Sequence, residues 1–196
     1  MQQLRSYLQD TWVSGEGAGR AIVDATSGDE VATASTSGLD LRAALEHGRT
    51  VGGPALRAMT FAERGRMLKA MAGVIHENRE ELLDVSRQGG TTRGDGKFDI
   101  DGASGTLSFY AYLSKSMGEG TFMLDGAQES VLGSKRFVAQ HIWTPRQGVA
   151  IHINAFNFPA WGMAEKAACA LLAGVPVLSK PATATCLLYT SDAADE

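Results

Sequence analysis

Apolar positions recur with different spacings along the chain, and each spacing predicts a different kind of element. Near the N-terminus, short apolar runs at 12–13, 21–23 and 31–33 are separated by segments rich in glycine, serine and aspartate. Such runs between turn residues predict a small β-hairpin layer. The glycines in the segment 15–19 lack the GxGxxG spacing of a phosphate-binding loop, so we interpret them as a turn.

The next part has helical spacing. A helix is expected at 39–49, and a longer one begins at Thr60, where Thr60 and Glu63 fit a T-x-x-E capping box. Five apolar residues of this second helix are predicted to share one face and to fill the core: Met67, Leu68, Met71, Val74 and Ile75.

Two further segments complete the middle of the chain. The helical pattern resumes after Asn78 and stops at 89–90, and a third helix is expected at 100–116, with a start weakened by glycines. The segment 121–145 alternates apolar and polar residues, which predicts paired strands joined to the helical layer.

The pattern changes again at Gly148. An apolar run at 149–153 predicts a buried strand, and a helix is expected at 159–172 with Gly174 as its C-cap. A second buried strand follows at 175–179. A strand, a helix and a strand in this order form a β-α-β unit, which is the building block of a parallel nucleotide-binding sheet.

Composition narrows the class of protein. Of the 196 residues 44% are hydrophobic and 20% are charged, and the formal net charge is -4, which is typical of a globular protein and argues against a nucleic-acid partner. The uncharged, mostly apolar stretch 167–179 is too short for a membrane span, so no membrane is expected. The N-terminal residues lack the apolar segment of a secretory signal, which favours a cytoplasmic location.

Cysteine and histidine give no ligand pattern. The two cysteines, Cys169 and Cys186, have neither CxxC nor zinc-site spacing, and the four histidines are scattered. We therefore expect no metal and no disulfide framework. Cys169 lies among alanines in the predicted helix at 159–172, so we interpret it as a small core residue.

Two motifs and the distance between them carry a family resemblance. INAFNFP and the later GVPVLSKPA resemble the PWNFP and GNTVVLKPA motifs of the aldehyde dehydrogenase superfamily. The resemblance runs from Met1 to about Thr185, and implies an α/β fold: the truncated N-terminal part of a Rossmann-type parallel-sheet cofactor domain with an oligomerisation β-arm. On this basis 1–147 form the hairpins, helical layer and arm, and 148–185 form the first β-α-β unit of the cofactor sheet.

Asn157 is the candidate catalytic residue. Its side-chain amide, at a turn from strand to helix, can donate a hydrogen bond to a carbonyl oxygen that becomes an oxyanion, and this is the role that the resemblance implies. Asparagine is also a favoured N-cap before a helix with an early proline, so capping is the alternative interpretation.

The cofactor-binding candidates follow the two strands. Lys180 ends a strand at the edge where α/β sheets bind ligands, and the resemblance implies that it holds the adenosine ribose or its phosphate. Many NAD-using members carry glutamate three residues later; Thr183 stands here, which favours NADP, with NAD as the alternative. The resemblance places Ile153, Asn154 and Phe156 on the nicotinamide side, although Ile153 and Phe156 fit ordinary packing at a strand end almost as well.

The resemblance also implies what lies elsewhere. The family's nucleophilic cysteine and general-base glutamate fall beyond this sequence, so the chain as written is expected to be inactive. Residues 186–196 do not continue the family pattern, and CLLYTSDAADE can be encoded by a transposon-end sequencing adapter. We interpret this tail as an artefact in which Cys186, Tyr189 and Asp192 carry no function.

Three further runs, MQQL at 1–4, PALRAMTF at 54–61 and KPATAT at 180–185, resemble the branch of the family that acts in phenylacetate catabolism. The activity that this resemblance implies for the full-length protein is NADP-dependent oxidation of a CoA-linked semialdehyde to the acid. The segment 121–145 resembles the oligomerisation arm of the family, which implies that the full-length protein is a homo-oligomer. Two alternatives stay open: a semialdehyde dehydrogenase of another aromatic-CoA pathway, of the benzoyl-CoA type, and a noncatalytic nucleotide-binding or assembly module.

Overall fold

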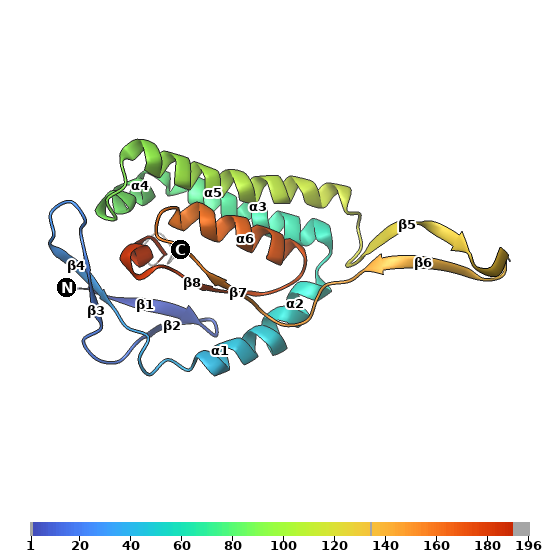
Figure 1. Cartoon of the computed structure of the whole chain (residues 1–196), viewed down its shortest axis with the longest axis horizontal. Helices are drawn as coiled ribbons and strands as arrows, with labels where there is room; N and C mark the ends of the chain where they lie inside the picture. The colour runs from blue at the N-terminus through green and yellow to red at the C-terminus, as the bar shows by residue number, and fades with distance from the viewer. Residues whose placement is uncertain (1, 134, 190–196) are drawn as a thin grey trace.

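The computed structural model describes residues 2–133 and 135–189, which form an N-terminal sheet, a helical layer, a projecting ribbon and a β-α-β unit (Figure 1). The strands are β1 (Gln2–Leu8), β2 (Thr11–Ser14), β3 (Arg20–Val23), β4 (Glu30–Ala34), β5 (Met123–Ser130), β6 (Val138–Trp143), β7 (Ala150–Ile153) and β8 (Val177–Lys180). The α-helices are α1 (Leu41–His47), α2 (Gly53–Ala58), α3 (Phe61–Glu77), α4 (Arg79–Gln88), α5 (Arg93–Leu113) and α6 (Pro159–Leu172). Shorter helical turns are η1 (Gly48–Gly52), η2 (Ser114–Ser116), η3 (Val131–Gly133) and η4 (Thr183–Tyr189).

The N-terminal sheet has the strand order β2-β1-β4-β3, in which β1 and β4 run parallel and the other pairs are antiparallel. The predicted hairpin layer is therefore incomplete, since the sequence pattern missed β1. This strand is mostly polar, and Leu4 is its only fully buried side chain. Gln9 and Asp10 form the turn from β1 to β2 and have positive φ. Glycine or asparagine at these positions would have indicated a β-hairpin more clearly in the sequence.

The helical layer matches the prediction at α3 and differs at α5. Thr60 caps α3, and both hydrogen bonds of the expected capping box with Glu63 are present. The third helix begins at Arg93 rather than at residue 100, because the Thr92 side chain caps it and accepts from the backbone of Asp95. The low helix propensity of glycine counted against a helix in this glycine-containing segment. The structure shows that α5 nevertheless accommodates these glycines.

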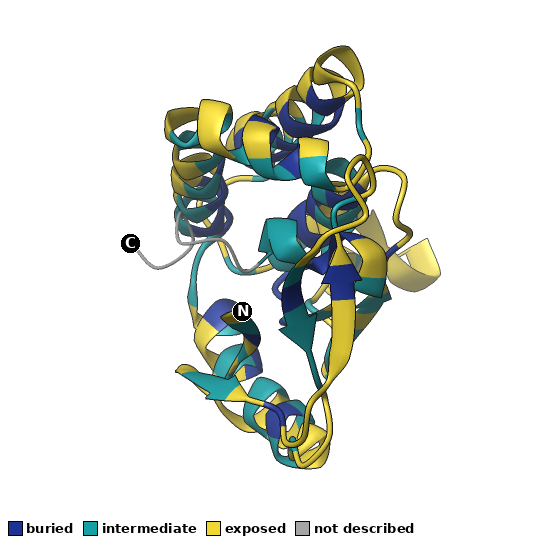
Figure 2. Cartoon of the chain, turned by 90° about the vertical axis from the view of Figure 1, so that its left-hand side faces the viewer, coloured by how far each residue is buried: buried dark blue, intermediate teal, exposed yellow. Residues whose placement is uncertain are grey.

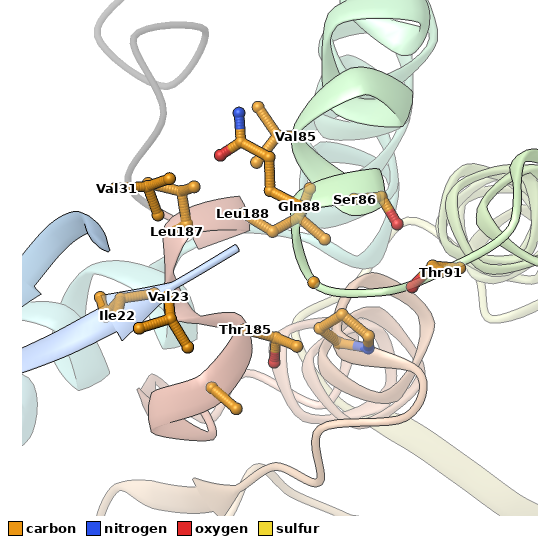
Figure 3. Close-up of a pocket in the computed structure, with 13 residues that line it drawn as sticks. Ile22, Val23, Val31, Val85, Ser86, Gln88, Thr91, Thr185, Leu187 and Leu188 are labelled. Atoms are coloured by element: carbon orange, nitrogen blue, oxygen red, sulfur yellow. The ribbon is translucent and has the colours of Figure 1, made fainter. Parts of the chain in front are cut away.

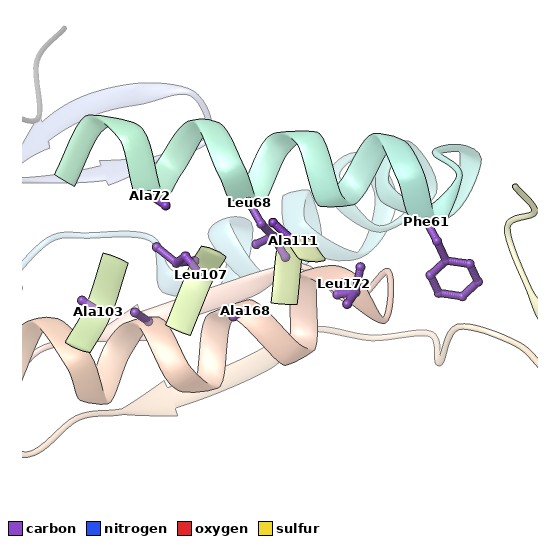
Figure 4. Close-up of a cluster of buried hydrophobic side chains, with 9 residues drawn as sticks. Phe61, Leu68, Ala72, Ala103, Leu107, Ala111, Ala168 and Leu172 are labelled. Atoms are coloured by element: carbon purple, nitrogen blue, oxygen red, sulfur yellow. The ribbon is translucent and has the colours of Figure 1, made fainter. Parts of the chain in front are cut away.

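The main core lies between α3, α5 and α6 (Figure 4). It is built from Phe61, Leu68, Ala72, Ala103, Leu107, Ala111, Ala164, Ala168 and Leu172. Of the residues predicted on the buried face of α3, Leu68 is fully buried and Met71 and Ile75 pack against the core, whereas Val74 is 48% exposed. The prediction was wrong for Val74 because the buried stripe also takes in Ala72, which moves its centre. Figure 2 shows buried segments on the inner sides of the helices and exposed ones outside.

The predicted paired strands form the antiparallel ribbon of β5 and β6, which projects away from the helices (Figure 1). Nearly every side chain of both strands is exposed, including Leu124, Ile142 and Trp143. The alternation of apolar and polar residues therefore predicts the pairing but not a buried face.

The predicted β-α-β unit is present. The strands β7 and β8 are parallel, with Ile153 opposite Lys180, and α6 connects them. Gly174 adopts φ +79 directly after the C-cap of α6 and ends the helix as expected. The strand β7 is not buried as predicted, since Ile151 is 58% and Ile153 is 74% exposed. Burial alternates along β7: Ala150 and His152 are half-buried on one face of the sheet, whereas Ile151 and Ile153 point to the other face, which the described residues leave exposed.

Candidate cofactor and oxyanion site

The carboxyl ends of β7 and β8 lie side by side. The backbone N–H of Asn154 donates to the carbonyl oxygen of Lys180 over 3.0 Å, which extends the parallel pairing by one residue. After this edge, β7 continues into the loop 154–158 and β8 continues into η4. Open parallel sheets bind ligands at such an edge, so the local fold brings the predicted cofactor residues to one place.

Asn154 is buried, with 5% exposure, and faces the interior. Its Nδ2 donates to Ser179 Oγ over 2.8 Å and to the Tyr189 hydroxyl over 3.2 Å, while its Oδ1 is buried without a partner. Tyr189 in turn donates to the carbonyl oxygen of Pro159 over 2.7 Å, and burial raises its pKa to about 12. Asn154 therefore holds the loop to β8 and η4 by its side chain.

Asn157 lies in the loop between β7 and α6 and is exposed. The N-cap of α6 is Phe158, and no side chain of the cap residue closes the helix. The capping interpretation of Asn157 is therefore wrong. Asn157 precedes the N-cap residue directly and is exposed, so its side chain is open to solvent in the loop.

Asp99 of α5 takes the capping role instead, and the sequence prediction missed it. Its Oδ1 accepts from the backbone of Trp161 over 2.8 Å and its Oδ2 from that of Ala160 over 3.1 Å. Asp99 is 2% exposed, and burial raises the pKa of its carboxyl against the opposing effect of the two N–H donors. A signal was present: Asp99 lies on the apolar stripe of Ile100 and Ala103, where a charge needs a partner.

An aromatic cluster holds the same loop from another side. The ring of Phe98 lies 6.1 Å from that of Phe158 and 5.1 Å from that of Trp161, both in edge-to-face arrangements. Trp161 is fixed further by a hydrogen bond from its Nε1 to Thr106 Oγ1 over 2.9 Å. The residues on either side of Asn157 are therefore tied to α5 and β8.

The remaining predicted residues are accessible at the edge. Ile153 and Phe156 are 74% and 66% exposed, Lys180 is exposed and Thr183 is half-buried at the start of η4. The donor set fits a dinucleotide, because apolar side chains can pack against the flat face of a nicotinamide ring while an ammonium and a hydroxyl meet phosphate or ribose oxygens. Among these residues Ile153, Asn154 and Lys180 are direct neighbours, and Phe156 and Asn157 follow in the loop.

The cysteines differ from the expectation in one respect. Cys169 was predicted in the core but is exposed, because α6 is apolar around most of its circumference and its spacing does not reveal the outer side. Cys186 is buried in η4, and burial raises the pKa of its thiol. The described residues contain no cluster of three potential metal ligands. None of the described helices combines the length and the apolarity that crossing a membrane requires.

A hollow beside the site is lined by the N-terminal sheet, the end of α4 and η4, including Ile22, Val85 and Leu188 (Figure 3). Its free volume is about 20 Å³, which is room for about one water molecule. We interpret it as a small gap between packed layers and not as a substrate pocket.

Asp192 of the C-terminal tail lies outside the described residues.

A parallel β-α-β unit with polar side chains at its carboxyl edge is typical of the class of nucleotide-binding α/β proteins. Residues 12–193 match the Aldehyde dehydrogenase family, and the chain belongs to that family. The family and the fold class predicted from the sequence are thus confirmed, although the match extends to residue 193 and does not end at about Thr185 as predicted.

The similar curated proteins are named as aldehyde or semialdehyde dehydrogenases, in agreement with the family match. The chain is 44% identical over 194 residues to 3,4-dehydroadipyl-CoA semialdehyde dehydrogenase of Aromatoleum evansii, covering 98% of this chain and 38% of that protein. It is 26% identical over 183 residues to betaine aldehyde dehydrogenase of Bacillus subtilis, covering 91% of this chain and 36% of that protein. The chain therefore spans less than two-fifths of the length of these relatives.

Solved structures share the fold. A 3,6-anhydro-L-galactose dehydrogenase in complex with NAP matches 99% of this chain and 40% of its own, with a TM-score of 0.82 and 18% identity. A double mutant of betaine aldehyde dehydrogenase from Staphylococcus aureus, in complex with NAD+, matches 96% of this chain and 37% of its own, with a TM-score of 0.80 and 21% identity.

Proposed function

We propose that this chain is the cofactor-facing part of an NADP-dependent aldehyde dehydrogenase that oxidises a CoA-linked semialdehyde to the acid in phenylacetate catabolism. The observation that carries the proposal is the site itself: an exposed Asn157 beside the edge where Ile153 and Lys180 meet. The 44% identity to an enzyme named for a CoA semialdehyde supports the substrate class.

In the proposed reaction, a cysteine thiolate outside this sequence adds to the aldehyde carbon, and the carbonyl oxygen gains negative charge. The Nδ2 group of Asn157 donates a hydrogen bond to that oxygen, which stabilises the charged state more than the neutral aldehyde. A bound NADP would supply the acceptor for the hydride that leaves the former aldehyde carbon. Hydrolysis of the resulting thioester releases the acid.

The cofactor is held by this chain's own residues in the proposal. Lys180 meets the negative charge of the 2′-phosphate at the strand end, and Thr183 offers a hydroxyl where a carboxylate would repel it. Ile153 and Phe156 give apolar surface on the nicotinamide side, and Asn154 shapes the loop between them through its buried hydrogen bonds.

We further propose that the full-length enzyme is a cytoplasmic homo-oligomer that uses the ribbon of β5 and β6. Exposed apolar side chains on both strands, such as Leu124, Val138 and Trp143, support this, because a second subunit can bury them. We propose no nucleic-acid or membrane partner.

A semialdehyde of another aromatic-CoA pathway is a second candidate substrate, and the name of the Aromatoleum evansii relative favours it. Purified full-length enzyme should be given 3,4-dehydroadipyl-CoA semialdehyde, 3-oxo-5,6-dehydrosuberyl-CoA semialdehyde and betaine aldehyde, with NADP or NAD. Faster reduction of NADP with 3-oxo-5,6-dehydrosuberyl-CoA semialdehyde than with the others is expected. Preference for the dehydroadipyl compound selects the second candidate, and no oxidation of any aldehyde favours a noncatalytic module.

A further inference from the structure

The start of α6 is held by a neighbouring helix and not by its own sequence. Phe158 is the N-cap and supplies no side-chain acceptor. Both oxygens of Asp99, which lies on α5, instead accept from the first turn at Ala160 and Trp161. The first turn of α6 is therefore fixed relative to α5 by one bidentate carboxylate.

This attachment lies close to the proposed oxyanion donor. Asn157 precedes the N-cap directly, and the ring of Phe98, the residue before Asp99 in α5, lies 6.1 Å from the ring of Phe158. A donor that is misplaced by about 1 Å loses much of its effect, since catalysis depends on where the hydrogen bond points as charge develops. Whatever fixes the first turn of α6 thus fixes the direction of the Asn157 amide.

We propose that Asp99 is a positioning residue for the oxyanion donor, which it aligns by holding the first turn of α6 against α5. The inference rests on the proposed function. Asp99 is buried and both of its carboxylate oxygens are occupied by N–H groups of α6, so in the proposal its effect on the reaction passes through Asn157. A cap that served stability alone could be supplied locally by serine or aspartate at position 158.

The test uses the full-length enzyme with Asp99→Ala and Asp99→Asn. We expect kcat to fall about tenfold or more in Asp99→Ala, with a smaller change in KM for NADP, because Lys180 and Thr183, which meet the 2′-phosphate in the proposal, lie outside the loop 154–158. Asp99→Asn should recover part of kcat, since its single carbonyl oxygen can accept from only one of the two N–H groups. Asp99→Asn also carries the test if the alanine variant does not fold.

Asp101→Ala is the matched control. Asp101 lies two residues along the same helix and pairs with Arg79 at the surface, over 2.6 and 2.7 Å. This variant should lower Tm and leave kcat unchanged. A fall in kcat equal to that of Asp99→Ala would mean that any weakening of α5 slows the reaction, which overturns the proposal.

A double-mutant cycle separates positioning from other effects. In an Asn157→Ala background, Asp99→Ala should change kcat by about twofold or less, because the group that it positions is gone. An equal loss of kcat with and without Asn157, or a lowered Tm with kcat unchanged, contradicts the proposal. A wild-type enzyme that oxidises no aldehyde contradicts the proposed function instead, so the two failures are distinguishable.

Discussion

Two buried charges satisfy backbone groups at opposite ends of α6. Asp99 accepts from N–H groups of the first turn, and Arg64 donates from its NH1 group to the carbonyl oxygen of Leu172 in the last turn, over 2.6 Å. The negative group is at the positive end of the helix dipole and the positive group is at the negative end. Neither residue is more than 2% exposed, so the helix between the two strands is held at both ends by side chains of α3 and α5.

Cofactor choice is the first prediction at the residue scale. In the full-length enzyme, kcat/KM should favour NADP over NAD by about ten- to a hundredfold, because a charge-assisted hydrogen bond contributes about 1.5 to 3 kcal/mol. Thr183→Glu should reverse the preference through repulsion of the 2′-phosphate, and Lys180→Ala should weaken both cofactors and NADP more. Steady-state kinetics with both cofactors measure this.

Lys115→Ala is the control for that measurement, since Lys115 is an exposed lysine in η2 at the far end of α5. It should change neither cofactor constant. Equal use of NAD by the wild type, or indifference to Thr183→Glu, contradicts the assigned roles of Lys180 and Thr183.

Sequence reasoning found the residues that belong to motifs and missed those that act from a distance. Asn157 and Lys180 stand in the two matched motifs, so their place at the strand ends was predictable. Arg64 and Asp99 were not found, because helical periodicity treats a charge on an apolar stripe as a break in the pattern. Their partners are backbone atoms distant in the chain, which no local pattern contains.

At the scale of elements, α5 contains glycines that differ in purpose. A Cβ built at Gly102 would lie 2.6 Å from Trp161 Cδ2, whereas a Cβ at Gly105 meets no atom within 4 Å. Gly102 therefore permits the close approach of α5 and α6, and Gly105 only lowers helix propensity.

These two glycines form a matched pair for the second prediction. Gly105→Ala should raise the free energy of unfolding by about 0.5 to 1 kcal/mol, because alanine loses less backbone entropy in a helix. Gly102→Ala should lower it despite the same gain in propensity, since the ring of Trp161 must move. Urea denaturation of both variants measures the difference, and stabilisation by Gly102→Ala would show that α6 yields easily at this contact.

The elements themselves were predictable where local rules and packing agree. The capping box at Thr60, the proline start of α6 and Gly174 each set a boundary that the structure confirms. The predicted start of α5 was wrong because packing there overrides helix propensity. The strand β1 was missed because it is polar and is held by pairing with β4.

At the scale of the whole molecule, the chain exposes apolar side chains on two surfaces. The sheet of β7 and β8 leaves Ile151 and Ile153 uncovered, and the ribbon of β5 and β6 extends from the helices with apolar side chains on both faces (Figure 1). Sequence patterns predicted these elements correctly but could not show which of their faces the rest of a protein covers.

The third prediction concerns activity of the chain as written. Neither described thiol stands at the carboxyl edge as a nucleophile: Cys169 lies on the outer side of α6, and Cys186 is buried with a raised pKa. We expect no aldehyde-dependent reduction of NADP or NAD. Turnover that is lost on Cys169→Ala would contradict this expectation, with Cys186→Ala as the comparison.

The most direct test of the account is kcat of the full-length enzyme with Asn157→Ala. Because the side chain of Asn157 does not cap α6, its removal should leave Tm unchanged, while loss of one oxyanion donor should lower kcat by about a hundredfold or more. An unchanged kcat, or a fall in kcat matched by a loss of folded enzyme, would contradict the oxyanion role on which the account is built.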